Sequence, residues 1–218
     1  MLYMERENPM QFNLRALKTA AMFVSDDKTR YYLGGVNVES RSDGFVFTAT
    51  NGHYLAMVRH NYLDGETAPD WGPFIIPTSL IERVKLGKHT DTASIDLGAD
   101  GLSISIQYMG ATYTEHRVDG CFPDARRVIP SSVSGETAQF NAAYVALFGK
   151  AKALITGKKA ESFIVISHNG GSPALVDFVP DGEAFQGFGV LMPYRTDKPM
   201  QQAPAWADVI GSSVAEAA

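Results

Sequence analysis

The sequence predicts an α+β fold in which one motif, a strand followed by a helix and further strands, is repeated three times. Two observations predict it. Apolar residues recur at helical spacing in three separate segments and alternate with polar residues between them. Turn signals built from glycine, asparagine, aspartate and proline separate the alternating runs. The 218 residues, 45% hydrophobic and 20% charged, suit one large or two small soluble domains.

The first repeat opens with a strand over Met10–Asn13. Apolar residues on one face then predict a helix over Leu14–Phe23. Two strands are expected after it, over Arg30–Glu39 and Phe45–Arg59, with the turn residues Ser42 to Gly44 between them.

The second repeat opens with the apolar strand Gly72–Pro77. Thr78 or Ser79 is expected to cap a short helix that continues through Leu80 and Ile81 to Val84. Three alternating strands follow, at Ala93–Leu97, Leu102–Tyr108 and Ala111–Val118.

The third repeat opens with Thr137–Asn141, and an apolar stripe from Tyr144 to Ile155 predicts its helix. Gly157 is expected to end that helix. The predicted strands are Ser162–Ser167, Ala174–Val179 and Phe185–Arg195. The segment 197–218 is rich in alanine, proline, glutamine and serine, and partial disorder is expected there.

The residue inventory argues against an enzyme, a metal site, a cofactor site and a membrane protein. Cys121 is the one cysteine, and the five histidines lack the spacing of metal ligands. No apolar run approaches the length of a membrane span, and the charged start lacks the apolar core of a signal peptide. A cytoplasmic location is therefore expected, with no catalysis, no cofactor and no membrane partner.

Positive charge is concentrated in the three predicted helical segments. Nine bases and one acid lie there, which gives these segments a net charge of +8. Because the whole chain has a net charge of −5, the rest of the chain carries −13. Segregated charge of this kind can attract phosphate locally, although solvated lysines on helix faces are the plainer explanation. The bases expected to face DNA are Arg15, Lys18, Arg83, Lys85, Lys88, Lys150 and Lys152.

The segment Val118–Pro130 is expected to be a stiff connector. Pro123 and Pro130 fix the backbone and prevent it from continuing as a strand, so Arg126 and Arg127 project from a rigid support. Considered alone, the segment is equally well explained as an interdomain linker with solvated arginines.

Four segments together resemble the bacterial sliding clamp, the beta subunit of DNA polymerase III. Arg30–Val36 is similar to a segment of that family. Ala49–Ala56 resembles its Ala-Thr-Asp-Gly-His-Arg-Leu-Ala signature, and Phe122–Pro130 its Phe-Pro-Asp-Tyr-Arg-Arg-Val-Leu-Pro. Val190–Arg195 resembles its Val-Val-Met-Pro-Met-Arg. The segments occur in the order of the family, and the resemblance covers about residues 10–196.

The resemblance implies DNA-clamp repeats in a ring around duplex DNA, with helices lining the hole and sheets outside. It also implies an outer pocket that binds short peptides of polymerases and repair proteins. Methionine suits a surface that meets many partners. The pocket residues implied are Leu33, Thr50, Gly52, His53, Tyr54, Leu55, Pro123, Arg127, Val128, Val190, Leu191, Met192, Pro193, Tyr194 and Arg195.

Four positions depart from the family pattern. Asn51 replaces an aspartate, Tyr54 an arginine, Ala125 an aromatic residue and Tyr194 a methionine. An altered preference at the rim of the pocket is expected from these changes.

By resemblance the chain holds about one and a half clamp domains. Residues 8–130 correspond to the complete middle domain and residues 136–196 to the second half of the last domain. The parts of the family that close the ring have no counterpart in this sequence. A half domain leaves an apolar face uncovered, so a two-fold homo-oligomer joined through the third repeat is expected, or cover by the segment after Thr196.

Two functions remain open at this stage. One is a processivity factor of DNA replication or repair that forms a ring from several short subunits on duplex DNA. The other is an interaction module that competes for clamp-binding proteins without encircling DNA. The basic helices favour the first, and the shortened chain favours the second.

Overall fold

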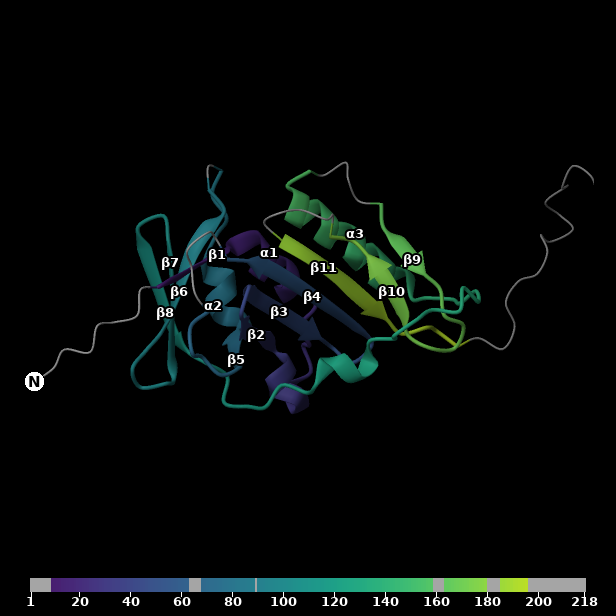
Figure 1. Ribbon diagram of the computed structural model, residues 1–218, viewed down its shortest axis with the longest axis horizontal. Coiled ribbons are helices and arrows are strands. Elements are labelled where there is room, and N and C mark those ends of the chain that lie inside the picture. Colours follow the sequence, from purple (N-terminus) through teal and green to yellow (C-terminus); the bar gives the residue numbers. More distant parts are fainter. Residues whose placement is uncertain (1–8, 63–67, 89, 159–162, 180–184, 196–218) are drawn as a thin grey trace, which may run out of the picture.

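The computed structural model describes residues 9–62, 68–88, 90–158, 163–179 and 185–195, and it has the predicted α+β fold. The strands form two antiparallel sheets, one of order β1-β6-β7-β8 and one of order β5-β2-β3-β4-β11-β10-β9 (Figure 1). The expected C-terminal segment 197–218 lies outside the described residues.

The first two repeats interlock by exchanging their first strands. The first repeat consists of β1 (Met10–Asn13), α1 (Leu14–Ala21), a 3-10 helix η1 (Lys28–Leu33), β2 (Gly35–Arg41), β3 (Gly44–Thr50) and β4 (Tyr54–Asn61). The second consists of β5 (Phe74–Pro77), α2 (Thr78–Arg83), β6 (Thr92–Leu97), β7 (Ser103–Tyr108) and β8 (Ala111–His116). Strand β1 pairs with β6 of the second repeat, and β5 pairs with β2 of the first.

The third repeat extends the sheet of the first. It consists of α3 (Ala142–Thr156), β9 (Val165–Ser167), β10 (Ala174–Asp177) and β11 (Phe185–Leu191). Strand β11 pairs antiparallel with β4 along its whole length, from Tyr54 opposite Leu191 to His60 opposite Phe185. The connector between the second and third repeats carries a short 3-10 helix, η2 (Ala125–Val128). It crosses the sheet on the face opposite α1 and α3 (Figure 1).

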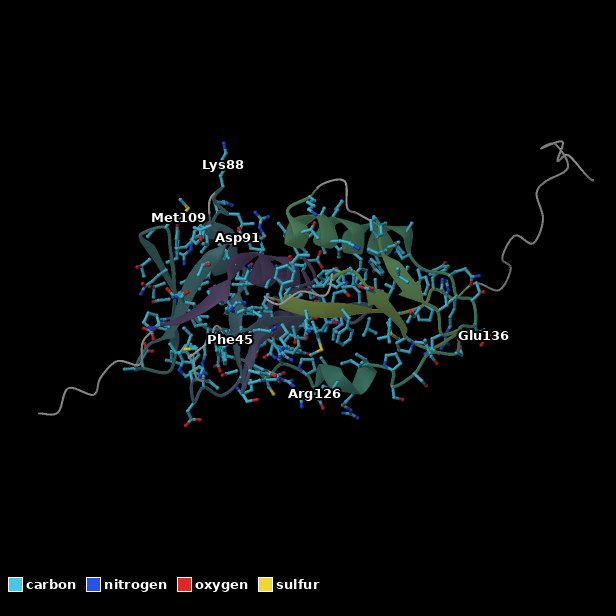
Figure 2. All side chains as sticks on the ribbon, turned by 45° about the horizontal axis from the view of Figure 1, so that its top comes forward. Phe45, Lys88, Asp91, Met109, Arg126 and Glu136 are labelled. Atoms are coloured by element: carbon cyan, nitrogen blue, oxygen red, sulfur yellow. The ribbon has the colours of Figure 1, made fainter. Side chains whose placement is uncertain are left out.

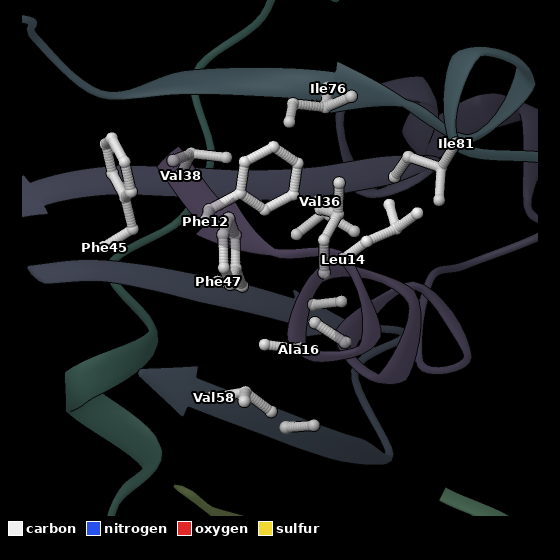
Figure 3. Close-up of a cluster of buried hydrophobic side chains, with 14 of the residues drawn as sticks. Phe12, Leu14, Ala16, Val36, Val38, Phe45, Phe47, Val58, Ile76 and Ile81 are labelled. Carbon is white, nitrogen blue, oxygen red and sulfur yellow. The ribbon is translucent and has the colours of Figure 1, made fainter. Parts of the chain in front are cut away.

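The core lies between the helices and the sheets. Phe12, Leu14, Val36 and Phe47 are essentially inaccessible to solvent and pack against one another (Figure 3). A second aromatic group fills the joint between the first and third repeats. The ring centroid of Phe23 lies 4.8 Å from that of Phe148 on α3 and 5.7 Å from that of Phe178 after β10. Burial of such large apolar groups drives the two repeats together.

Two expected strands of the first repeat are wrong in extent. Residues 28–33 form η1 because the carboxylate of Asp27 accepts a hydrogen bond from the Thr29 amide and caps the turn. The run Phe45–Arg59 is two strands, because Asn51 and Gly52 reverse the chain. Gly52 has φ of +91°, a conformation that glycine adopts without strain.

Helices α1 and α3 match their predictions closely. Asn13 caps α1, which ends two residues before Phe23, and Gly157 terminates α3 with φ of +70°. Helix α2 is shorter than the basic segment assigned to it and ends at Arg83. The expected cap of α2 is wrong, since the Thr78 hydroxyl instead donates to the Gly34 carbonyl.

The strands of the second and third repeats also differ from the predicted ranges. The two hairpin strands β7 and β8 are slightly shorter than expected, and β11 ends at Leu191, four residues before the predicted end. The expected opening strand at residues 137–141 is reduced to one bridge between Gln139 and Tyr194.

Candidate functional site

A pocket of about 280 Å³ lies where the first repeat, the connector and the third repeat meet. Four segments form it: η1, the β3–β4 turn, the connector and the end of β11. The lining residues are Arg30, Tyr32, Leu33, Thr50, Gly52, His53, Tyr54, Leu55, Pro123, Asp124, Ala125, Val128, Val190 and Met192.

The floor of the pocket is apolar and its mouth is open. Leu33, Leu55 and Val190 are at most 4% exposed and form a fixed floor. Val128 and Met192 are 44% and 38% exposed and stand at the mouth. Apolar side chains of a ligand could therefore be buried between the exposed pair at the mouth and the buried apolar floor.

The β3–β4 turn is held by its own side chains. The Asn51 side-chain oxygen accepts hydrogen bonds from the amides of His53 and Tyr54, at 2.8 Å and 3.2 Å. The Thr50 hydroxyl accepts from the Gly52 amide and donates to the Tyr54 carbonyl. Asparagine therefore retains the turn-forming oxygen that the family's aspartate would supply.

The third repeat holds the turn from the other side. The Met192 amide donates to the His53 carbonyl at 2.9 Å, and the ring of Tyr144 on α3 stacks near that of His53. Tyr54 lies edge-on to both Tyr144 and Phe23. Burial, with smaller contributions from Tyr144 and Asp26, raises the pKa of Tyr54, so its hydroxyl stays neutral at ordinary pH.

A cation stands at one wall of the pocket. The Arg30 Nε donates to the Asp27 carboxylate at 2.8 Å, and an Arg30 terminal nitrogen lies beside Gly52. Hydrogen bonds from Thr29 and Arg30 lower the pKa of Asp27 from 3.8 to about 2. The Asp27 carboxylate is therefore charged across the physiological range and orients Arg30.

The connector forms the opposite wall. Asp124 caps η2 by accepting from the Arg126 amide, and the Arg126 guanidinium contacts Glu39 of β2 at 3.1 Å. Arg126 thus links the connector to the sheet through an exposed ion pair, and the side chain of Arg127 is also exposed. On the other side of the connector lies a hollow of about 440 Å³ that Asn37, Glu39 and Arg126 help to line.

The structure brings ten of the fifteen proposed pocket residues together. The five that do not line the pocket are Arg127, Leu191, Pro193, Tyr194 and Arg195. Leu191 faces the core and is fully buried, while Tyr194 is 64% exposed and pairs with Gln139. Four lining residues were missed: Arg30, Tyr32, Asp124 and Ala125. All four belong to two of the four segments that carry the resemblance, so the resemblance marks the segments but not which of their residues face the pocket.

Three of the bases expected to face DNA have partners within the chain. Arg15 pairs with Asp91 at 2.6 Å and also donates to the Leu154 carbonyl. Lys18 donates to the Ile81 carbonyl at 2.8 Å. Burial and the nearby charge of Lys85 lower the pKa of Lys18, and Glu82 partly opposes them. Arg83 contacts Glu115 at 3.1 Å.

Of the other four, Lys85, Lys88 and Lys150 are exposed and Lys152 is half-buried. Lys85 and Lys88 follow the end of α2 rather than lying on it, and Figure 2 shows Lys88 extending away from the body on the side opposite Arg126. Lys150 is an exposed residue of α3. The ammonium of Lys152 lies 4.0 Å above the ring of Phe163.

The described residues contain no group of three histidine, cysteine or acidic side chains that could hold a metal ion. No helix among them is long and apolar enough to cross a membrane.

A family model, described as the DNA polymerase III beta subunit, central domain, matches residues 10–124. This is just over half of the chain, and it covers the first two repeats, with η1 and the β3–β4 turn of the pocket, and ends within the connector. The chain belongs to the DNA polymerase III beta subunit family.

Curated relatives named as beta sliding clamps match about half of the chain. The beta sliding clamp of Caulobacter vibrioides is 28% identical over 121 residues, which are 54% of this chain and 32% of that protein. The beta sliding clamp of Treponema pallidum is 29% identical over 108 residues, 49% of this chain and 28% of that protein. The matched region thus spans about a third of the length of each relative.

Solved structures show the same fold over nearly the whole chain. The sliding clamp of Bacillus subtilis superposes with a TM-score of 0.64 at 15% identity, covering 90% of this chain and 66% of that one. The beta subunit from Streptococcus pyogenes gives 0.65 at 14% identity, covering 90% and 68%. The third repeat, which the family model does not reach, therefore also has clamp architecture.

Proposed function

We propose that this protein is a non-catalytic, sliding-clamp-like component of DNA replication or repair whose pocket binds short peptides of polymerases or repair factors. The observation that carries the proposal is the pocket itself. Leu33 and Leu55 of the first repeat lie more than a hundred positions before Val190 of the third, yet together they form one apolar floor below an open mouth. Family membership supports the same assignment.

The geometry suits an extended peptide with apolar side chains. The buried floor accepts one or two such side chains, and the flexible thioether of Met192 adapts to their shape. The Arg30 guanidinium at the wall offers hydrogen-bond donors to a peptide carbonyl or carboxylate. Tyr54 and Ala125 change the wall chemistry relative to the family signature, so a different sequence preference is expected from that of the relatives.

Peptide binding is tested by calorimetry with a clamp-binding peptide of a bacterial replicative polymerase. One peptide per chain is expected, and Val128→Ala or Met192→Ala should weaken binding about tenfold, because each removes apolar contact area at the mouth. Met109→Ala is the matched control, since Met109 is 64% exposed on the β7–β8 turn, away from the pocket. If Met109→Ala weakens binding equally, or the peptide does not bind, the pocket assignment fails.

A second proposed activity is non-specific contact with duplex DNA through the helical face. The specific support is a set of exposed bases, Lys85, Lys88 and Lys150. Exposed ammonium groups attract phosphate without sequence preference. The ion pairs of Arg15 and Arg83 leave fewer accessible bases than the sequence indicates.

Binding to circular and to linear DNA distinguishes a ring that encircles DNA from an interaction module that does not. A ring is retained on nicked circular DNA and slides off after linearisation, whereas an interaction module behaves identically on both. We favour the interaction module, because among the described residues the outer edge of β8 has no partner strand that would help to close a ring. Retention on circles alone would establish the ring instead.

A further inference from the structure

The third repeat has an apolar face that the described part of the chain leaves uncovered. Helix α3 is apolar nearly all round, a composition typical of a helix buried on every side. One face, with Phe148 and Ile155, packs into the core. The other lines a mostly apolar groove of about 560 Å³ with Val145, Ala146 and the exposed ring of Phe163, and Lys150 also lies along it.

The neighbouring sheet edge is also unpaired among the described residues. Strand β9 is hydrogen-bonded to β10 on one side and ends the seven-stranded sheet on the other. Phe163 and Val165 at this edge are 70% and 56% exposed. Edge strands with exposed apolar residues readily pair with another strand.

The first two repeats show how such an edge is completed in this protein. Strands β2 and β6 are the counterparts of β9, and each pairs with the strand that precedes the helix of the other repeat. In the third repeat the segment 138–141 immediately precedes α3, but it makes one bridge only, between Gln139 and Tyr194. The third repeat therefore has a segment that can pair as a strand, 138–141, and an unpaired sheet edge, β9, among the described residues.

We propose that two copies of this chain associate through their third repeats, each placing residues 138–141 on the β9 edge of the other. The two α3 grooves then face each other across a two-fold axis. The arrangement repeats between chains what the first two repeats do within one chain. A second copy is the occupant favoured because one symmetric contact fills both edges and covers both apolar faces.

The internal repeats also give the register. Strand β2 begins to pair with β5 at Gly35, two residues before it begins to pair with β3. Strand β6 has the same offset, because its pairing with β1 begins at Thr92 and its pairing with β7 at Ser94. Strand β9 meets β10 first at Val165. The corresponding register places Asn141 opposite Phe163, Phe140 opposite Ile164 and Gln139 opposite Val165 of the second copy.

The exchange has an identifiable cost. The segment gives up the bond from the Tyr194 amide to the Gln139 carbonyl and the bond from the Ala138 amide to His168 Nδ1. It gains a strand ladder in their place, and the apolar groove is removed from water in both chains.

The mass of the full chain in solution is the first test. Sedimentation equilibrium at micromolar concentration should give a dimer. Ala146→Glu and Phe163→Asp should each give a folded monomer, with folding checked by circular dichroism, because both place a charge in the interface. Leu102→Asp is the control, since Leu102 is 51% exposed on the other sheet, and it should remain dimeric.

Cysteine pairing tests the register. In a Cys121→Ser background, Gln139→Cys combined with Val165→Cys should form a disulfide-linked dimer, since opposed strand residues lie within disulfide range. Gln139→Cys with Glu115→Cys, at the free edge of β8, should not. A monomeric full chain, a dimer that links only through the control pair, or dimerisation that appears only when residues 197–218 are removed would each overturn the proposal.

Discussion

Gly189 of β11 lies directly against the ring of Phe148 on α3. A Cβ atom at Gly189 would stand 2.1 Å from Phe148 Cε1, far inside contact distance. The absent side chain lets α3 sit against the strand that pairs with β4. This contact lets α3 lie close to β11, and from there Tyr144 reaches the β3–β4 turn that forms the pocket wall.

Gly189→Ala should therefore destabilise the protein by about 1–3 kcal/mol, because the added methyl forces Phe148 from its position. Urea unfolding measures the change. Gly171→Ala is the matched control, since a Cβ there meets nothing within 4 Å, and it should shift stability by less than about 0.5 kcal/mol. Equal midpoints for the two variants would contradict this account of the joint.

Phe23→Ala should loosen the first and third repeats together. The ring packs against Phe148 and Phe178 of the third repeat and against Tyr54 of the first, so its loss should cost about 3–5 kcal/mol. Hydrogen exchange should show the amides of β4 and β11 losing protection to the same extent, since the strands share one ladder. Protection retained in β4 and lost in β11 would mean that the repeats unfold separately.

Asp27→Asn should remove a pH-dependent contribution to stability. The pKa of Asp27 in the folded protein, about 2, is below its ordinary value of 3.8. The folded state therefore gains from this carboxylate above about pH 3.8 and loses that gain as the pH falls toward 2. The stability difference between wild type and Asp27→Asn should accordingly be present at pH 7 and nearly absent at pH 2.

Asp100→Asn provides the control for the pocket. Hydrogen bonds from Ser103 and Leu102 lower the pKa of Asp100 to about 2 as well, but this residue lies on the β6–β7 turn. Both variants should show the same pH-dependent loss of stability. Only Asp27→Asn should weaken peptide binding at pH 7, because only Asp27 orients Arg30. Equal peptide affinities for the two variants would show that Arg30 does not contribute to peptide binding.

Arg15→Met and Lys150→Met should have opposite consequences. Arg15 holds Asp91 and the Leu154 carbonyl, so its loss should lower stability by about 1–2 kcal/mol with little effect on DNA binding. Lys150 is exposed, so its loss should leave stability unchanged. If it contacts phosphate, the slope of log affinity against log salt should decrease by about 1. Thermal unfolding and DNA binding at several salt concentrations distinguish the two.

The sequence predicts α1 and α3 well because their ends are encoded locally. Asn13 offers a capping oxygen and Gly157 a left-handed terminus, and neither depends on distant residues. Tyr31, Tyr32 and Leu33 have the composition of a strand, and the prediction there was wrong. The cap from Asp27 and the hydrogen bonding of Arg30 to it override strand propensity over those few residues.

The candidate site shows a similar division. Its apolar residues are recognisable by resemblance, but which neighbour faces the pocket is not. Val190 lines the pocket, whereas Leu191, the next residue along β11, points into the core. Successive strand residues point to opposite faces, so the assignment depends on how the strand is placed in the sheet. Arg30 was missed for a related reason, since only the fold brings it beside Gly52.

The sequence by itself determined the three repeats, most turn positions and the family, because capping, periodicity and turn chemistry act over a few residues. The tertiary structure decided that β11 pairs with β4 and that the second repeat pairs with the first by strand exchange. Backbone hydrogen bonds between strands do not depend on which residues form them, so a strand can pair with any exposed sheet edge. The choice depends on whether the side chains on both faces pack, and here Phe23 of the first repeat packs against Phe148 and Phe178 of the third.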